Sequence, residues 1–138
     1  MRRRPIRRRS RSEQMALVRH KNTKPERVVR RGLWAAGLRY RLHARSLPGK
    51  PDLVFPRARL AIFIHGCFWH RHEGCRGTRT PKTNVDFWKA KFSANVRRDQ
   101  RVMEELEALG WRTVVIWECE IPGRNWLELI ARLLGKNN

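Results

Sequence analysis

An uninterrupted apolar run at residues 59–66 (RLAIFIHG) most constrains the fold. A strand with one face in water alternates apolar and polar side chains, whereas a run that is apolar at nearly every position suits a strand buried on both faces. A second run of this kind lies at 112–118 (RTVVIWE). Because both faces of such strands need cover, the two runs predict an α/β sandwich, a sheet packed between helices.

Weaker signals predict the other elements. Thr23 is a predicted helix N-cap, with Pro25 in the first turn and Glu26 completing a capping box, so a helix is expected to run to about Gly37. The remaining expected elements are a short helix at 12–22 capped by Ser12, strands at 38–44 and 52–55 joined through a Pro-Gly turn, a long helix at 85–109 capped by Thr83 or Asn84 and ended by Gly110, and a C-terminal helix at 125–136. The predicted architecture is a central mixed β-sheet flanked by helices.

The composition is strongly basic. The 138-residue chain carries a formal charge of +20 and has a pI near 11.7, which favours nucleic acid as the partner. The length suits a single domain, expected at 12–138, and the arginine-rich residues 1–11 are expected to form a disordered basic tail or an arm that grips phosphate. The sequence shows neither a secretory signal nor an apolar stretch that could span a membrane, so a cytoplasmic protein is expected.

A concentration of metal-ligand side chains follows the first apolar run, in HGCFWHRHEGC (65–75). Cys67, His72 and Cys75 lie in this segment, and Cys119 follows the second apolar run. Three thiols and an imidazole are the ligands of a closed, structural zinc site. The alternative is that these are unrelated, reduced cysteines.

Other polar residues near the strand ends suggest catalysis. Asp52 begins one predicted strand and His65 ends its neighbour, so a Mg²⁺ ion held by Asp52 can position a phosphate and a water molecule there. His65 and His70 can move a proton or hold the phosphate. Asp52 can instead be a turn residue and either histidine a structural one. Glu26 can orient a histidine or a metal-bound water, although a capping role explains it equally well.

Three aromatic residues are candidates for contact with bases. Phe68 and Trp69 lie among the proposed zinc ligands, and Trp88 begins the predicted long helix. Aromatic wedges can enter a base step at a cost that is lower where a pair is mismatched. The alternative is ordinary core packing, and for Trp34, Trp111, Trp117 and Trp126 the sequence favours a place in the core or in an interface.

The chain resembles a known family, the very-short-patch-repair DNA mismatch endonucleases. The resemblance extends from about residue 12 to residue 120 and rests on five segments: MALVRHKNTKPE, SLPGKPDLVF, AIFIHGCFWHRH, DFWKAKFSANVRRD and LGWRTVVIWEC. It implies a restriction-endonuclease-like fold with a structural zinc. It also implies Mg²⁺-dependent nicking of one DNA strand beside the thymine of a T:G mismatch, such as deamination of 5-methylcytosine produces.

The resemblance also implies roles for individual residues. Asp52 matches the Mg²⁺ ligand, joined by the backbone carbonyl of Ile64, which stands where a well-known member of the family has threonine. The other implied roles are His65, His70 and Glu26 in catalysis, Cys67, His72, Cys75 and Cys119 on zinc, Phe68, Trp69 and Trp88 as the wedge in the major groove, and Met15 in an N-terminal arm on the minor-groove side.

The expected function is therefore strand nicking at T:G mismatches in double-stranded DNA, by a monomer that leaves a 5′-phosphate, with other repair proteins as candidate partners. Three alternatives remain. A related nuclease of the same fold would cut paired DNA equally well. A zinc-stabilised module without activity would bind mismatched DNA and never cut it. A hydrolase with an open zinc site would work without Mg²⁺.

Overall fold

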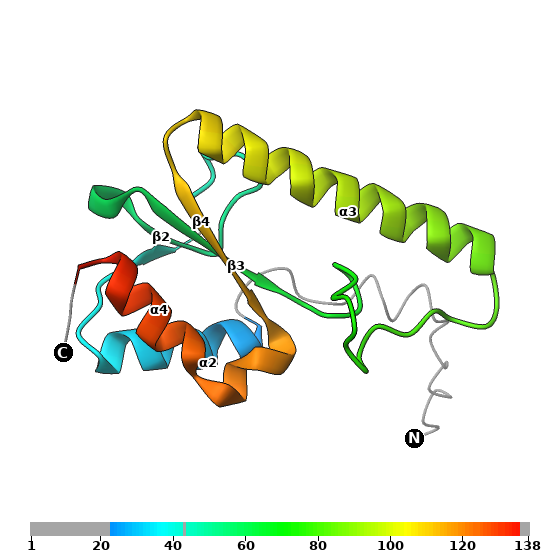
Figure 1. Ribbon diagram of the computed structural model, residues 1–138, viewed down its shortest axis with the longest axis horizontal. Helices are drawn as coiled ribbons and strands as arrows, with labels where there is room; N and C mark the ends of the chain where they lie inside the picture. The colour runs from blue at the N-terminus through cyan, green and yellow to red at the C-terminus, as the bar shows by residue number, and fades with distance from the viewer. Residues whose placement is uncertain (1–22, 43, 136–138) are drawn as a thin grey trace, which may run out of the picture.

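A computed structural model gives the fold of residues 23–42 and 44–135 (Figure 1). The basic tail at 1–11, the short helix predicted at 12–22 and Met15 lie outside these described residues. Among the described helices, none combines the length and hydropathy needed to cross a membrane.

The sheet is mixed, as predicted. Its four strands lie in the order β1 (Arg41–Leu42), β2 (Leu53–Phe55), β3 (Leu60–His65) and β4 (Arg112–Trp117). The first three strands pair antiparallel, whereas β3 and β4 pair parallel. Strand β1 is much shorter than the predicted 38–44. It lies at the edge of the sheet with both residues exposed, so it has only β2 to hold it.

Three helices follow the predicted pattern, α2 (Lys24–Ala35), α3 (Val85–Ala108) and α4 (Asn125–Leu133). The Thr23 hydroxyl caps α2 by accepting a hydrogen bond from the Glu26 N–H at 3.3 Å. The predicted side-chain cap of α3 does not form. Asn84 occupies the N-cap position in a left-handed conformation, and its side chain makes no capping hydrogen bond. Two short 3₁₀ helices, Pro56–Ala58 and Glu118–Gly123, follow β2 and β4.

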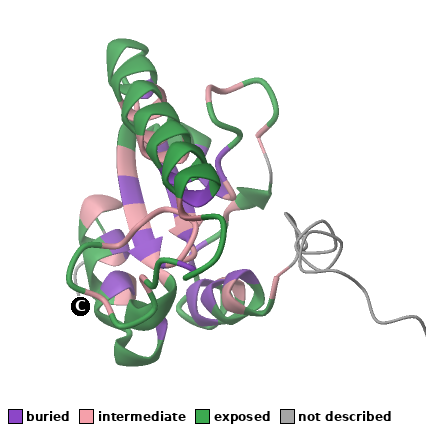
Figure 2. Ribbon diagram, turned by 90° about the vertical axis from the view of Figure 1, so that its right-hand side faces the viewer, coloured by how far each residue is buried: buried purple, intermediate pink, exposed green. Residues whose placement is uncertain are grey.

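The helices cover both faces of the sheet (Figure 1). On one face α2 and α4 pack on the strands in a core that includes Val29, Leu33, Ile62, Ile116 and Ile130. On the other face Leu106 of α3 packs with Val54, Ala61 and Phe63 of the sheet. Figure 2 shows the buried residues on the strands and on the helix sides turned toward them. The predicted sandwich is therefore confirmed.

The N-terminal half of α3 extends beyond the sheet, alongside the segment that leaves β3 (Figure 1). This segment, residues 66–84, contains turns and bends but neither helix nor strand, and we call it the site loop. Core packing does not account for every tryptophan. Trp126 is 4% exposed, as predicted, whereas Trp34 is 54% exposed and carries the Arg39 guanidinium 3.6 Å above its ring.

Close packing of α2 on α4 generates a stability prediction. A Cβ atom at Gly32 would lie 2.7 Å from Cη2 of Trp126, whose indole is held by a hydrogen bond to the Ile121 carbonyl. Gly32→Ala should therefore lower the free energy of unfolding by about 1–3 kcal/mol, the usual cost of overpacking, although alanine favours a helix. Chemical denaturation measures the change. Gly123→Ala is the matched control, because its Cβ would meet nothing within 4 Å; equal stability of the two variants would contradict the packing argument.

Candidate functional site

The parallel pairing of β3 with β4 brings the polar segments together. His65, the last residue of β3, lies opposite Trp117, the last residue of β4. Parallel strands end at the same edge of a sheet, so the chain that follows each of them starts from one place. The site loop and the 3₁₀ helix Glu118–Gly123 therefore meet there.

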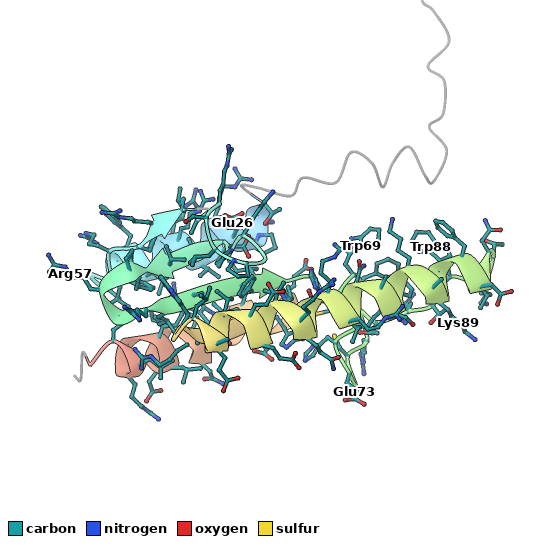
Figure 3. All side chains as sticks on the ribbon, turned by 90° about the horizontal axis from the view of Figure 1, so that it is seen from above. Glu26, Arg57, Trp69, Glu73, Trp88 and Lys89 are labelled. Atoms are coloured by element: carbon teal, nitrogen blue, oxygen red, sulfur yellow. The ribbon has the colours of Figure 1, made fainter. Side chains whose placement is uncertain are left out.

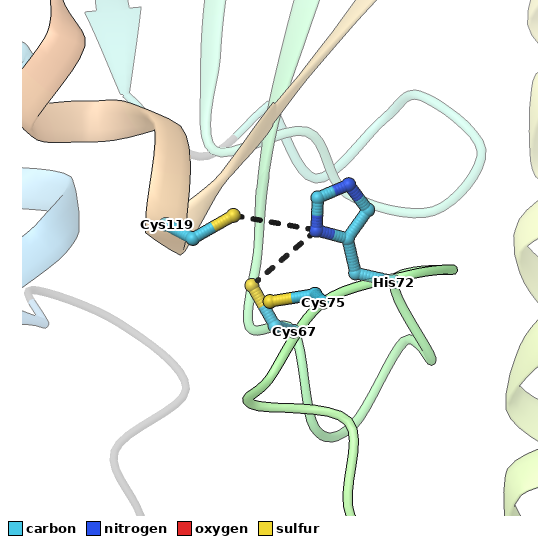
Figure 4. Close-up of side chains that lie close together, drawn as sticks. All are labelled: Cys67, His72, Cys75 and Cys119. Atoms are coloured by element: carbon cyan, nitrogen blue, oxygen red, sulfur yellow. Dashed lines mark hydrogen bonds between the residues drawn. The ribbon is translucent and has the colours of Figure 1, made fainter.

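Three thiols and one imidazole converge at this edge (Figure 4). The ligand atoms of Cys67, His72, Cys75 and Cys119 all lie within 4.8 Å of one another. His72 Nδ1 is 3.7 Å from Cys67 Sγ and 3.3 Å from Cys119 Sγ. Ligands at about 2.3 Å (sulfur) and about 2.0 Å (nitrogen) from a tetrahedral metal are separated by comparable distances. We call these four residues the thiol cluster; they can hold one metal ion.

The surroundings of the thiol cluster suit a metal. His72 Nε2 lies 3.9 Å from a carboxylate oxygen of Glu120, and metal-binding histidines commonly face a carboxylate with their second nitrogen. The Thr78 hydroxyl donates to the His72 carbonyl at 2.6 Å, which fixes the backbone of the ligand. The imidazole thus lies with Nδ1 toward the thiols and Nε2 toward Glu120.

The thiols affect one another's charge. The Gly77 N–H, which donates to Cys75 Sγ at 3.4 Å, together with the nearby His72, lowers the pKa of Cys75 to about 7. Desolvation, with the neighbouring thiols of Cys67 and Cys75, raises the pKa of Cys119 to about 12. Three thiolates this close repel one another, so a cation among them would favour the charged form of all three.

A second group of residues lies beside the thiol cluster. The rings of His65 and His70 stack at 3.8 Å between centroids, and His70 Nδ1 is 2.6 Å from Asp99 Oδ2. Burial, with the adjacent His70 second, lowers the pKa of His65 to about 4, against the opposing effect of Asp99. His65 is thus neutral at pH 7 and His70 has a carboxylate partner, an arrangement suited to proton transfer. We call these three residues the histidine pair and its aspartate.

The sequence-based prediction did not include Asp99, although the spacing of residues along the predicted helix gave a signal for it. Trp88, Phe92, Asn95 and Asp99 recur every three or four residues and therefore share one face of the predicted helix. That face meets the site loop, because Asn95 also donates to the Trp69 carbonyl at 3.3 Å. The periodicity places Asp99 on the helix face of Trp88 and Phe92, but only the tertiary fold brings that face to the histidines.

Asp52 is tied to the end of β3. Its Oδ2 accepts a hydrogen bond from the Ile64 N–H at 2.8 Å, and its own N–H donates to the Ile62 carbonyl at 3.0 Å. The half-buried carboxylate is thereby held beside the main chain one residue before His65. The Ile64 side chain packs against the core beneath α2 and α4. Carboxylate and backbone carbonyl oxygens are ligands that Mg²⁺ accepts, and the Asp52 carboxylate lies beside the main chain of Ile64.

Glu26 lies at the start of α2 rather than in either group of possible metal ligands found in the described part of the chain. Its side chain is almost fully buried and pairs with the Arg30 guanidinium at 2.6 Å. Burial of a charged pair is costly unless its geometry is well satisfied. The pairing of this first-turn residue with Arg30 supports a structural role of Glu26 in α2, and its catalytic role stays a prediction.

The candidate wedge residues form one aromatic group. Ring centroids are 5.1 Å apart for Phe68 and Trp69, and 6.1 Å apart for Trp69 and Trp88. Figure 3 shows Trp69 and Trp88 along the same side of α3. Trp88 is 8% exposed, whereas Phe87, which sequence analysis did not single out, is 60% exposed. Within this aromatic group Trp88 is buried, and the neighbouring Phe87 ring is exposed to solvent.

The domain is mixed α/β and strongly basic, and it holds a cluster of possible metal ligands beside a histidine pair, which suits a metal-dependent protein with an anionic partner. The chain matches the family model of the DNA mismatch endonuclease Vsr over residues 6–76. It is 52% identical over 119 residues to the type II nicking enzyme V.XorIIP of Xanthomonas oryzae, covering 86% of this chain and 85% of the relative. It is 41% identical over 118 residues to the DNA mismatch endonuclease Vsr of Escherichia coli, covering 86% and 75%.

A further relative, the type II nicking enzyme V.NmeAIP of Neisseria meningitidis, is 42% identical over 114 residues, covering 83% of this chain and 81% of the relative. The chain belongs to the DNA mismatch endonuclease Vsr family. The family resemblance expected from the sequence is therefore confirmed.

The geometry of the thiol cluster predicts metal binding. Cys119→Ser removes one of the four ligands, so affinity for Co²⁺, a coloured probe of thiolate sites, should fall by more than the roughly 10–100-fold that loss of a supporting residue costs. Titration followed by the thiolate-to-metal absorption band measures this affinity. Glu73→Gln, an exposed change in the same loop, is the control (Figure 3). Equal Co²⁺ affinity of Cys119→Ser and the wild-type protein would exclude the cluster as the metal site.

Proposed function

We propose that the protein is an endonuclease that nicks one strand of double-stranded DNA beside the thymine of a T:G mismatch and so initiates very-short-patch repair. The observation that carries the proposal is the position of Asp52, hydrogen-bonded to the end of β3 where the histidine pair begins, in a chain of the Vsr family. The mixed sheet with helices on both faces supports a restriction-endonuclease-like fold. A single domain at 12–138 is part of the proposal.

Two metals have separate roles in this proposal. Mg²⁺ would be held by the Asp52 carboxylate and the Ile64 carbonyl, where it supplies charge neutralisation at the scissile phosphate and orientation of the attacking water. Zinc fits the thiol cluster, because cysteine sulfur and histidine nitrogen are its usual ligands. Four protein ligands would leave no open position on the metal for substrate. Its role would be structural, to fasten the site loop to the end of β4.

The histidines supply proton transfer. His70 is oriented by Asp99 through Nδ1, which leaves Nε2 as the atom that can exchange a proton with water or with the leaving oxygen. His65 lies stacked on His70 and buried, so it excludes water from one side of that ring. Glu26 would act in support, from the start of α2. Hydrolysis would leave a 5′-phosphate.

Recognition would combine charge with aromatic wedging. The net charge of +20 supplies attraction to phosphate that weakens with salt, and it carries no sequence information. Phe68, Trp69 and Trp88 would enter the base stack where the T:G pair is already weak. Met15, in the N-terminal arm, is proposed to lie on the opposite side of the duplex.

Removing the proposed Mg²⁺ ligand should abolish nicking. Asp52→Asn keeps an oxygen that can accept from the Ile64 N–H but loses the charge, so the nicking rate with Mg²⁺ should fall by roughly 10²-fold or more, the loss typical of one charge-stabilising group. The measurement is gel analysis of a labelled T:G duplex. Glu104→Gln, an exposed change on α3, is the control. Asp52→Asn nicking at the wild-type rate would refute the assignment, whereas binding without nicking by the wild-type protein would support the inactive module.

Removing a wedge residue should reduce discrimination. Trp69→Ala should weaken binding to a T:G duplex by about 1–3 kcal/mol, the worth of one aromatic–base stack, and weaken binding to fully paired DNA less. Competition binding at fixed salt, with a panel of mismatches, measures the ratio. Trp34→Ala is the control, because Trp34 is exposed on α2. Equal cutting of paired and mismatched DNA by the wild-type protein would instead support the related nuclease.

A further inference from the structure

Trp117 lies between the thiol cluster and the histidine pair. Its indole stacks on the His72 ring at 4.3 Å between centroids and 9° between planes. It also contacts the His65 ring edge-on, at 5.3 Å and 76°. One side chain thus contacts a candidate zinc ligand and a candidate catalytic residue at once.

The position of Trp117 is fixed by the sheet. It ends β4, and six residue pairs, from Leu60 with Arg112 to His65 with Trp117, join β4 to β3. His70 and His72, by contrast, belong to the site loop, which has no regular structure. Trp117 therefore offers a rigid surface against which a loop residue can be placed.

The His65 ring depends on such surfaces. In the described part of the chain we find no hydrogen bond to its imidazole; its contacts are with the rings of Phe63 at 5.9 Å, Trp117 at 5.3 Å and His70 at 3.8 Å. His70, in turn, is held by Asp99 through one nitrogen. Ring packing is what sets the angle of His65, and the stacked His70 ring lies parallel to it.

We propose that Trp117 is a positioning residue, whose indole sets the orientation of the His65 ring and, through the stack, that of His70, while resting on His72 of the thiol cluster. The inference depends on the proposed function for its catalytic consequence. The positioning role needs a flat ring at position 117, and it does not depend on the indole N–H. A smaller aromatic ring should therefore retain the function, whereas an aliphatic side chain of similar hydrophobicity should lose it.

The test compares Trp117→Phe with Trp117→Leu, in the full chain loaded with zinc. Trp117→Leu should lower kcat on a T:G duplex by on the order of 10–100-fold, the cost of misplacing a catalytic group by about 1 Å, with KM changed less than threefold. Trp117→Phe should restore kcat to within about threefold of the wild-type value. Trp111→Phe and Trp111→Leu are matched controls, because Trp111 lies just before β4 and packs on the core beneath α3; both should keep kcat.

Zinc content and thermal stability separate positioning from collapse. A Trp117→Leu protein with full zinc content and lowered kcat supports the inference, and one whose kcat stays within twofold of wild type overturns it. If Trp117→Leu does not retain zinc, Trp117→Met takes its place under the same criteria, because its unbranched chain fills space without a flat face.

Nuclear magnetic resonance makes the test independent of nicking. Labelled histidine side chains should show one ring orientation for His65 in the wild-type protein and in Trp117→Phe, and averaging among orientations in Trp117→Leu. An unchanged, single orientation in Trp117→Leu overturns the inference. A wild-type protein that shows this ordering but never nicks would count against the proposed function alone.

Discussion

The parallel pairing of β3 with β4 is the constraint on which the rest of the structure depends. Both strands are apolar and packed among helices, and a shift of their pairing by one residue would send every side chain to the opposite face of the sheet. That register places His65 beside Trp117 and starts the site loop and the Glu118–Gly123 turn from one edge. Cys67 and Cys119 are distant in sequence, yet both lie near the His72 imidazole because each follows the end of one of these paired strands.

The site loop has no helix or strand, although it carries ligands of the thiol cluster and one of the paired histidines. Its backbone has turn hydrogen bonds, such as those from the His70 N–H to the Gly66 carbonyl and from the His72 N–H to the Cys67 carbonyl, but no strand or helix ladder, so side chains must add to its support. Arg71 supplies one support, since its guanidinium donates to the Arg79 carbonyl at 2.9 Å and lies 4.0 Å above the Phe92 ring. The thiol cluster supplies the other. A metal bound there would constrain the loop from the β4 side while α3 constrains it from the aromatic side.

How far the sequence determines this arrangement differs between elements. The apolar runs predicted β3 and β4 almost to the residue, because burial on both faces leaves an unmistakable composition. The edge strand β1 was predicted too long, because alternation in the sequence does not reveal how few partners an edge strand has. The thiol cluster could be predicted as a set, since its ligand types are rare. Asp99 was missed because the partner of His70 comes from α3, and only the tertiary fold brings that face to the loop.

Ile64 shows why a change at a site need not change its chemistry. Alternation along β3 sends the Ile64 side chain toward the core shared with α2 and α4, and the His65 side chain toward the histidine pair. What Asp52 contacts at this position is the Ile64 main chain. The core therefore selects the side chain, whereas the hydrogen bond to Asp52 involves the backbone. An apolar β-branched residue suits that core better than threonine would, because a threonine hydroxyl would need a partner there. A role for this position through its carbonyl is compatible with isoleucine, whereas a role through a side-chain hydroxyl is not.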